Sequence, residues 1–282
     1  MKCAWQAYLN LLPTWMRRDV DVQGRETLQE LRLRLNYPPE LVTRCGSVWL
    51  ERVVTKDDLS FCINTASDYS PWAAKSIEQG YITAAGGHRI GLCGKVARSK
   101  ESILAFTMPT SLNLRVARDF VGICRQIAEI DASMLILGRP GSGKTTLLRD
   151  IIRTKSEKGP GSIAVVDERA ELFPSIQNQM CFVTGKRTEV MTGCTKQQGI
   201  EMMLRTMSPE IIAVDEITAK EDCQALIHAG WCGVKLIATA HAGNKMDLLT
   251  RPVYRPLVES RLFETLIVLQ PDKSFKLERM PV

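Results

Sequence analysis

The feature that most constrains this 282-residue chain is a glycine-rich loop at residues 138–145, GRPGSGKT. It fits the pattern GxxxxGK[ST], in which glycines let backbone N–H groups curl around phosphate oxygens, a lysine adds positive charge and a hydroxyl reaches Mg²⁺. An apolar stretch at 133–137 precedes the loop, and an amphipathic stretch at 145–153 follows it. The order strand, loop, helix predicts a nucleotide-binding site.

The residues of this loop are the candidate ligands of ATP and Mg²⁺. Lys144 has little structural purpose inside a glycine loop unless an anion binds there. Thr145 is the expected Mg²⁺ ligand, and Thr146 either contacts the α-phosphate or caps the helix. The full set of expected nucleotide contacts is Gly138, Arg139, Pro140, Gly141, Ser142, Gly143, Lys144, Thr145 and Thr146.

From residue 131 onward, apolar strands alternate with helices, which predicts a parallel sheet covered by helices. The strand at 211–216, IIAVDE, ends in two acids. Asp215 is expected to orient a metal-bound water, and Glu216 is the leading general base or water-positioning group, with a strand-end acid paired to a lysine as the alternative. The acids of the strand at 162–169 are either solvated or part of the same site.

Capping boxes predict the starts of two helices in this region. Thr195 and Gln198 open a helix at 195–207, and Thr218 with Glu221 opens a second helix that runs to about residue 229.

Histidines and arginines offer further candidates. His241 ends the strand at 234–241, where it is either a structural hydrogen-bonding group or, if this strand neighbours the one with Asp215, a contact for the γ-phosphate or the attacking water. His88 and His228 are expected to be structural. Three arginines, 89, 115 and 118, either reach the site of a neighbouring subunit or lie on a solvated surface.

The first 120 residues predict a smaller α+β domain. Its expected elements are a strand at 30–36, a helix at 55–67, a hairpin at 80–94 that turns at Gly86 and Gly87, and a helix at 119–130. The N-terminal segment, broken at Pro13, is expected to pack as a helix on this domain or, less well supported, to touch a membrane surface. The predicted domains are therefore 1–120 and 121–282.

The composition indicates the cellular compartment in which the chain works. The chain is 45% apolar and 24% charged, carries a net charge of +6, and has nine scattered cysteines without a CxxC pair. This composition predicts free thiols in a reducing cytoplasm, without a membrane span or an export signal.

Two blocks carry a resemblance to a known family. LRTMSPEIIAVDEI at 204–217, and GVKLIATAHAG at 233–243, resemble the Walker B and His-box blocks of the secretion ATPase superfamily, which drives type II and type IV export systems. The loop GRPGSGKTTLLRD, the segments VVDERAE and SLNLRVAR, and the N-terminal ELRLR and GGHRIGLCGK are together similar to the sporulation ATPases of endospore-forming bacteria.

The resemblance implies a RecA-like P-loop NTPase domain with a parallel-strand core, preceded by the smaller α+β domain, in a homo-hexameric ring. It implies a Mg²⁺-dependent ATPase that sits in the cytoplasm, peripheral to a membrane-embedded channel or export apparatus. By position it makes Glu168 of the acidic "Asp box" a second candidate carboxylate beside Glu216, and His241 the His-box residue. Asp215 stands where secretion motors usually have glycine, and the four-cysteine metal module of some export ATPases is missing, so zinc is not expected.

Two other functions stay open at this point. A RecA-like sheet also serves nucleic-acid motors, and a nucleotide-binding domain can act as a regulatory switch with little turnover. A nucleic-acid motor predicts a stripe of basic and aromatic residues. Aromatics make up only 6% of the chain, and charges of both signs are mixed, so no nucleic-acid partner is expected.

Overall fold

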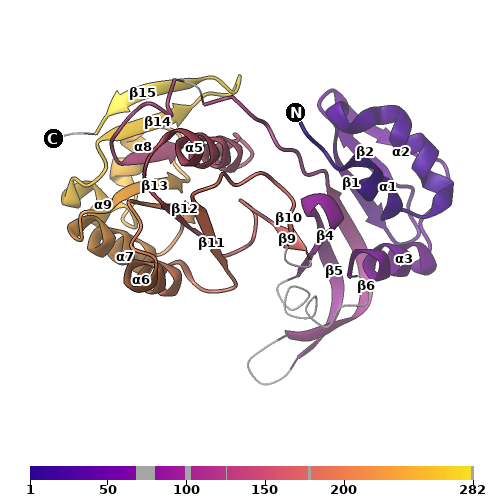
Figure 1. The fold of residues 1–282 in the computed structure, drawn as a ribbon. Coiled ribbons are helices and arrows are strands. Elements are labelled where there is room, and N and C mark those ends of the chain that lie inside the picture. The colour runs from indigo at the N-terminus through magenta and orange to yellow at the C-terminus, as the bar shows by residue number, and fades with distance from the viewer. Residues whose placement is uncertain (68–79, 99–102, 125, 177–178, 281–282) are drawn as a thin grey trace. The chain divides into compact units, whose positions relative to one another are not determined.

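The computed structural model describes residues 1–67, 80–98, 103–124, 126–176 and 179–280, which form two compact units (Figure 1). The first unit comprises Met1–Asp119 and Ser175–Phe182, and the second comprises Phe120–Pro174 and Val183–Val282. Residues 175–182 therefore group with the first unit although they lie inside the range expected for the second domain. No helix among the described residues is both long and apolar enough to cross a membrane.

The first unit is an antiparallel sheet with helices on one face. In spatial order its strands are β3 (Gly46–Trp49), β2 (Glu40–Thr43), β1 (Leu28–Arg34), β6 (Ile103–Arg115), β5 (His88–Arg98) and β4 (Tyr81–Ala84). Its helices are α1 (Trp5–Asn10), α2 (Thr14–Thr27) and α3 (Lys56–Ser67). Leu31 and Leu33 are fully buried among helix residues, whereas Arg32 and Arg34 alternate with them and stay partly exposed, which confirms the period-two strand.

The glycine hairpin is also confirmed. β4 and β5 pair antiparallel across a short 3₁₀ turn, η1 (Ala85–Gly87), and both Gly86 and Gly87 have φ near +79°. A Cβ at Gly86 would lie 2.4 Å from the Cβ of Ala4, so this turn excludes a side chain for steric as well as conformational reasons. A two-stranded ribbon, β9 (Ser175–Ile176) with β10 (Gln179–Met180), completes the unit and contacts η1.

The second unit is built on a mixed sheet whose core is parallel. In spatial order its strands are β11 (Thr188–Thr192), β8 (Ile163–Asp167), β12 (Ile211–Ile217), β13 (Lys235–Ala240), β7 (Met134–Leu137), β14 (Thr265–Leu269) and β15 (Phe275–Arg279). Only the last pair, β14 with β15, is antiparallel. The α/β fold class predicted from the alternating pattern is confirmed.

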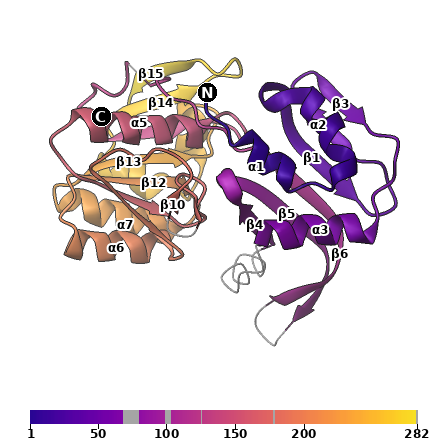
Figure 2. The same cartoon turned by 45° about the vertical axis from the view of Figure 1, so that its right-hand side comes forward.

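Helices cover both faces of this sheet. Leu135 and Leu137 pack in one cluster with α6 (Lys196–Thr206) and α7 (Lys220–Trp231), and so do Ile212 and Val214. The residues between them in each strand point to the opposite face. Both views place the strands between α5 (Lys144–Lys158) and the α6–α7 pair (Figure 1, Figure 2). Two short helices, α8 (Lys245–Thr250) and α9 (Arg255–Ser260), follow β13.

One capping box is confirmed and the other is wrong by one residue. The Thr195 hydroxyl accepts from the N–H of Gln198, and the Gln198 side chain accepts from the N–H of Thr195, at the start of α6. At the start of α7 the capping carboxylate is Asp222, which accepts from Thr218 N at 2.9 Å and Ala219 N at 3.1 Å. Glu221, the expected partner, does not take this role.

The predicted helix at 119–130 is wrong, because another group takes its N–H donors. The buried carboxylate of Asp150 accepts from Gly122 N at 3.0 Å and Cys124 N at 2.9 Å. Burial alone would raise the pKa of Asp150, but these backbone N–H groups outweigh it and the pKa lies below its usual value. Gly122 has φ +83°, so the described part of the segment forms turns instead of a helix.

Candidate nucleotide-binding site

The loop that follows β7 has the shape of a phosphate cradle. Gly141 and Gly143 have φ values of +72° and +103°, which favour glycine. A Cβ at Gly138 would lie 2.3 Å from the Ser142 hydroxyl oxygen, so the loop is too tight for a side chain there. That hydroxyl oxygen is buried and has no hydrogen-bond partner among the described residues. A tight loop with an unsatisfied polar atom fits a ligand of hydrogen-bonding character, such as the phosphates of ATP.

Hard oxygen ligands for Mg²⁺ meet beside this loop. Thr145 donates its hydroxyl to Asp215 Oδ2 at 2.6 Å, and Thr239 donates to Asp215 Oδ1 at 2.6 Å. Thr145 lies in the first turn of α5, Asp215 lies near the carboxyl end of β12 and Thr239 lies on β13, so three elements converge at the carboxyl edge of the sheet. A hydroxyl and a carboxylate suit Mg²⁺, so Thr145 and Asp215 fit the metal role that the sequence predicts for them.

Lys144 connects the loop to His241. Its ammonium donates to the carbonyl oxygens of Gly138 at 3.0 Å and Arg139 at 3.2 Å, and lies 3.0 Å from Nδ1 of His241. An ammonium has only donors, so Nδ1 accepts and the ring proton sits on Nε2. Burial lowers the pKa of Lys144, and the charges of Asp215 and Glu216 oppose that effect. The lysine is thus a desolvated cation with an anionic neighbourhood.

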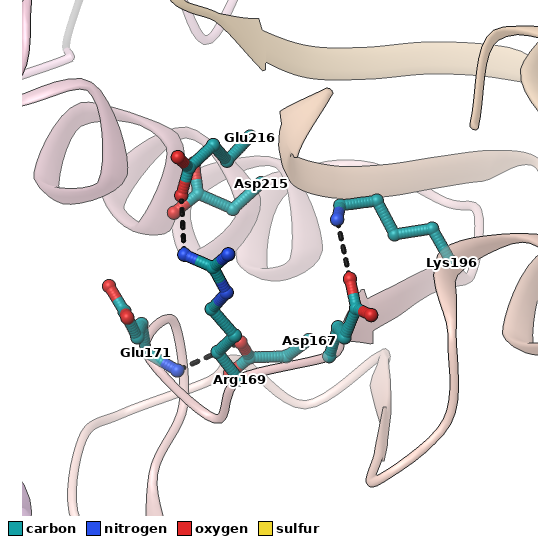
Figure 3. Close-up of a pocket in the computed structure, with 7 residues that line it drawn as sticks. Asp167, Arg169, Glu171, Lys196, Asp215 and Glu216 are labelled. Carbon is teal, nitrogen blue, oxygen red and sulfur yellow. Dashed lines mark hydrogen bonds and ion pairs between the residues drawn. The ribbon is translucent and has the colours of Figure 1, made fainter. Parts of the chain in front are cut away.

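Glu216 is held from both sides. His241 donates from Nε2 to Oε1 at 2.9 Å. Arg169 donates to Oε2 at 3.2 Å, as Figure 3 shows. The backbone N–H of Glu216 donates to the Thr239 hydroxyl at 2.8 Å, and its φ is +57°, uncommon for a residue with a side chain. The result is a continuous chain of contacts from Lys144 through His241 and Glu216 to Arg169.

Glu168 lines the same pocket as Asp215 and Glu216 but has a different partner. Lys196 Nζ lies 2.6 Å from Glu168 Oε2, and its side chain is only 6% exposed (Figure 3 shows Lys196 pointing into the pocket). The sequence left open a lysine-paired acid at position 216. In the structure the lysine pairing occurs at Glu168, whereas Glu216 pairs with an arginine and a histidine.

Asp167 lines the pocket and organises the loop that follows β8. Its carboxylate is 2% exposed and accepts from the N–H groups of Glu171 at 2.8 Å, Leu172 at 2.9 Å and Phe173 at 2.8 Å. Arg149 of α5 donates to the carbonyl oxygens of Leu172 and Glu171 in the same turn. These bonds fix the loop that carries Glu168 and Arg169.

Replacing Asp167 by asparagine tests this environment through pH. Burial raises the pKa of Asp167 to about 6 from 3.8, against the opposing N–H of Phe173. The folded state then binds the proton more tightly than the unfolded chain, so the free energy of unfolding contributed by Asp167 falls as pH rises from about 4 to 6. We expect the cost of Asp167→Asn, measured by urea unfolding, to shrink between pH 4 and pH 7 by up to about 3 kcal/mol. A cost that stays constant across this range contradicts the raised pKa.

The other histidines and the arginines have distinct surroundings. His88 is fully buried, accepts from Ala117 N and bonds Ala4 O, so its role is structural. Arg118 donates to the backbone carbonyls of Arg25 and Leu28. Arg89 stacks on Tyr81 at 3.9 Å, and Arg115, with 58% of its side chain exposed, lies 3.5 Å from Glu30. Arg115 is therefore the most accessible of the three arginines, and Arg118 is committed to its own unit.

A family model and a curated relative point to the same family. The family model described as "Sporulation stage III, protein AA" matches residues 6–276. Stage III sporulation protein AA of Bacillus subtilis (strain 168) is 35% identical over 256 residues, which cover 87% of this chain and 83% of that protein. An uncharacterized protein ycf45 of Cyanidium caldarium is 33% identical over 180 residues, covering 60% of this chain and 52% of that protein.

Solved structures share the fold at low identity. The ATPase DotB of Legionella pneumophila superposes with a TM-score of 0.61 at 15% identity, covering 95% of this chain and 80% of that chain. The pilus retraction motor PilT with bound ADP superposes with a TM-score of 0.64 at 14% identity, and the match covers 94% of this chain and 82% of the PilT chain. This likeness shows a RecA-like P-loop fold.

Proposed function

This chain belongs to the sporulation stage III protein AA family, and we propose that it is a Mg²⁺-dependent ATPase motor that powers a membrane-embedded channel or export apparatus during endospore formation. The observation that carries the proposal is that Lys144, Thr145, Asp215 and Glu216 lie together at the carboxyl edge of the parallel core of one sheet. Phosphoryl transfer requires these groups: a cation, a metal site and a carboxylate near the phosphates.

The residues divide the chemistry as follows. The loop from Gly138 to Thr146 binds the phosphates, and Lys144 exchanges its carbonyl and histidine partners for phosphate oxygens. Thr145 and Asp215 hold Mg²⁺, which supplies positive charge for the phosphates when bound. Glu216 orients the attacking water or accepts its proton, while His241 and Arg169 fix its carboxylate. Glu168 supports the same pocket from the neighbouring strand.

Assembly and location belong to the same proposal. We expect a homo-hexamer in the cytoplasm, peripheral to a membrane complex, with the site completed by a neighbouring subunit. The resemblance of the blocks at 204–217 and 233–243 to the secretion ATPases supports this expectation. The PilT structure, which shares the fold, holds ADP. Arg115 is the preferred arginine to act across subunits, because Arg118 is bound to backbone carbonyls of its own unit.

The test is ATP hydrolysis per subunit across a range of protein concentrations, with and without single-stranded DNA, with Glu216→Gln as the blank. We expect a rate that rises with concentration and ignores DNA, because a shared site forms only on assembly. A rate that stays flat until DNA is added would favour a nucleic-acid motor. ATP binding with a rate equal to the blank would favour a regulatory switch.

A further inference from the structure

The β14–β15 hairpin lies beside the nucleotide loop. β14 pairs parallel with β7, and Val268 is opposite Leu137, the last residue before the loop. The carboxyl end of β14 therefore reaches the same edge of the sheet as the phosphate cradle. The turn that closes the hairpin, residues 270–274, is bonded from Gln270 N to Ser274 O at 2.8 Å and from Lys273 N to Gln270 O at 3.0 Å.

This turn places one lysine on the rim of the cradle. Lys273 Nζ donates to the carbonyl oxygen of Gly141 at 2.6 Å, across 132 residues of sequence. Lys273 has φ +70°, a strained value for a residue with a side chain. The carboxylate of Asp272 stabilises the turn by accepting from Ser274 N at 3.0 Å and Ser274 Oγ at 2.6 Å. The turn thus holds Lys273 in an uncommon backbone conformation in which its ammonium reaches the glycine loop.

The charge of Lys273 is not neutralised in the described part of the chain. No carboxylate lies within ion-pair distance of its ammonium among these residues, and Nζ makes one hydrogen bond there, to Gly141. An ammonium has three N–H donors, so two remain available beside the loop. Lys144 is different, because it is buried and its donors already have three acceptors.

We propose that Lys273 is a second lysine of the nucleotide site, which contacts the polyphosphate of the bound nucleotide while its bond to Gly141 keeps it at the rim. The inference rests on the proposed function, because it requires that phosphates occupy the loop. Lys144 binds them from within the loop, and Lys273 closes the site from the hairpin.

The test measures affinities for ADP and a non-hydrolysable ATP analogue by calorimetry with Mg²⁺ present, on the full chain. Lys273→Ala should weaken both affinities about tenfold, as expected for losing a hydrogen bond from a charged group. Lys273→Gln keeps a donor for Gly141 but lacks the charge, so it should lower both affinities as much as Lys273→Ala does. Lys273→Arg keeps the charge and should retain most of the affinity of the unaltered protein. The matched control is Lys276→Ala, on exposed β15 of the same hairpin, which should bind like the unaltered protein.

The outcomes separate this inference from the proposed function. If Lys273→Gln binds as tightly as the unaltered protein, Lys273 only braces the loop and the inference is wrong. If Lys273→Ala itself has no effect, the inference is also wrong, while a loss of binding in Lys144→Ala would still support the proposed function. If Lys144→Ala retains full affinity, the nucleotide site itself is misassigned and both fail.

Discussion

Replacing Lys144 by alanine is expected to remove measurable ATP binding. The lysine is the only cation bonded to both carbonyl oxygens at the start of the loop and to His241 in the described structure, and it begins α5, whose N-terminus favours anions. Truncating one partner of a buried charged pair costs affinity on the order of 100-fold. Calorimetry with ATP and Mg²⁺ measures the loss directly.

The fold should survive this substitution. Burial lowers the pKa of Lys144, which means that folding disfavours its charged form. Without a bound phosphate, the charged side chain therefore does not stabilise the fold. We expect its free energy of unfolding to change by about 1 kcal/mol or less. Lys158→Ala, an exposed residue at the other end of α5, is the matched control and should bind ATP normally. Retained affinity in Lys144→Ala would refute the assignment of the loop.

The elements with strong local signals could be predicted from the sequence. The glycine loop, the strands β12 and β13 with the acids and the histidine at their carboxyl ends, and the capping box at Thr195 are each encoded by a few consecutive residues. The parallel pairing of the core strands was also predicted, from the alternation of strands and helices along the chain. From the sequence, the role of His241 depended on whether its strand lies next to the strand that carries Asp215. The structure shows that these strands, β13 and β12, are neighbours.

The errors arise where a distant side chain decides the local structure. The segment 119–130 has a helical pattern, but Asp150, 26 residues beyond Cys124, takes its N–H groups. The same reason explains why Arg169 was missed. Its bond to Glu216 spans 47 residues and depends on β8 lying next to β12.

Two features of the site carried no sequence signal. The φ of +57° at Glu216 accompanies a register shift between Val214 and Ile217, which turns the carboxylate toward His241, and no pattern predicts such a bulge. Lys273 lies in an ordinary polar turn, PDKS, whose position beside the loop follows only from the pairing of β14 with β7. Site residues contributed by long-range pairing therefore require the fold.

Replacing Glu216 by glutamine is expected to stop hydrolysis while ATP still binds. Glutamine keeps the size of the side chain, but its amide cannot accept a proton, and its NH₂ group faces a donor from either His241 or Arg169. Removing a general base lowers turnover by about 100-fold to 10,000-fold. Phosphate release at saturating ATP measures the rate, and calorimetry should show an affinity within about threefold of the unaltered protein.

Glu168→Gln decides how the two carboxylates divide the work. Glu168 pairs with Lys196 of α6, whereas Glu216 is connected through His241 to Lys144 of the glycine loop. We therefore expect Glu168→Gln to lower turnover less than Glu216→Gln does. Glu210→Gln, an exposed acid just before β12, controls for the loss of one charge and should hydrolyse ATP normally. If Glu168→Gln were inactive and Glu216→Gln active, the base would be Glu168, and the chain from Lys144 to Arg169 would serve to position the loop instead of the water.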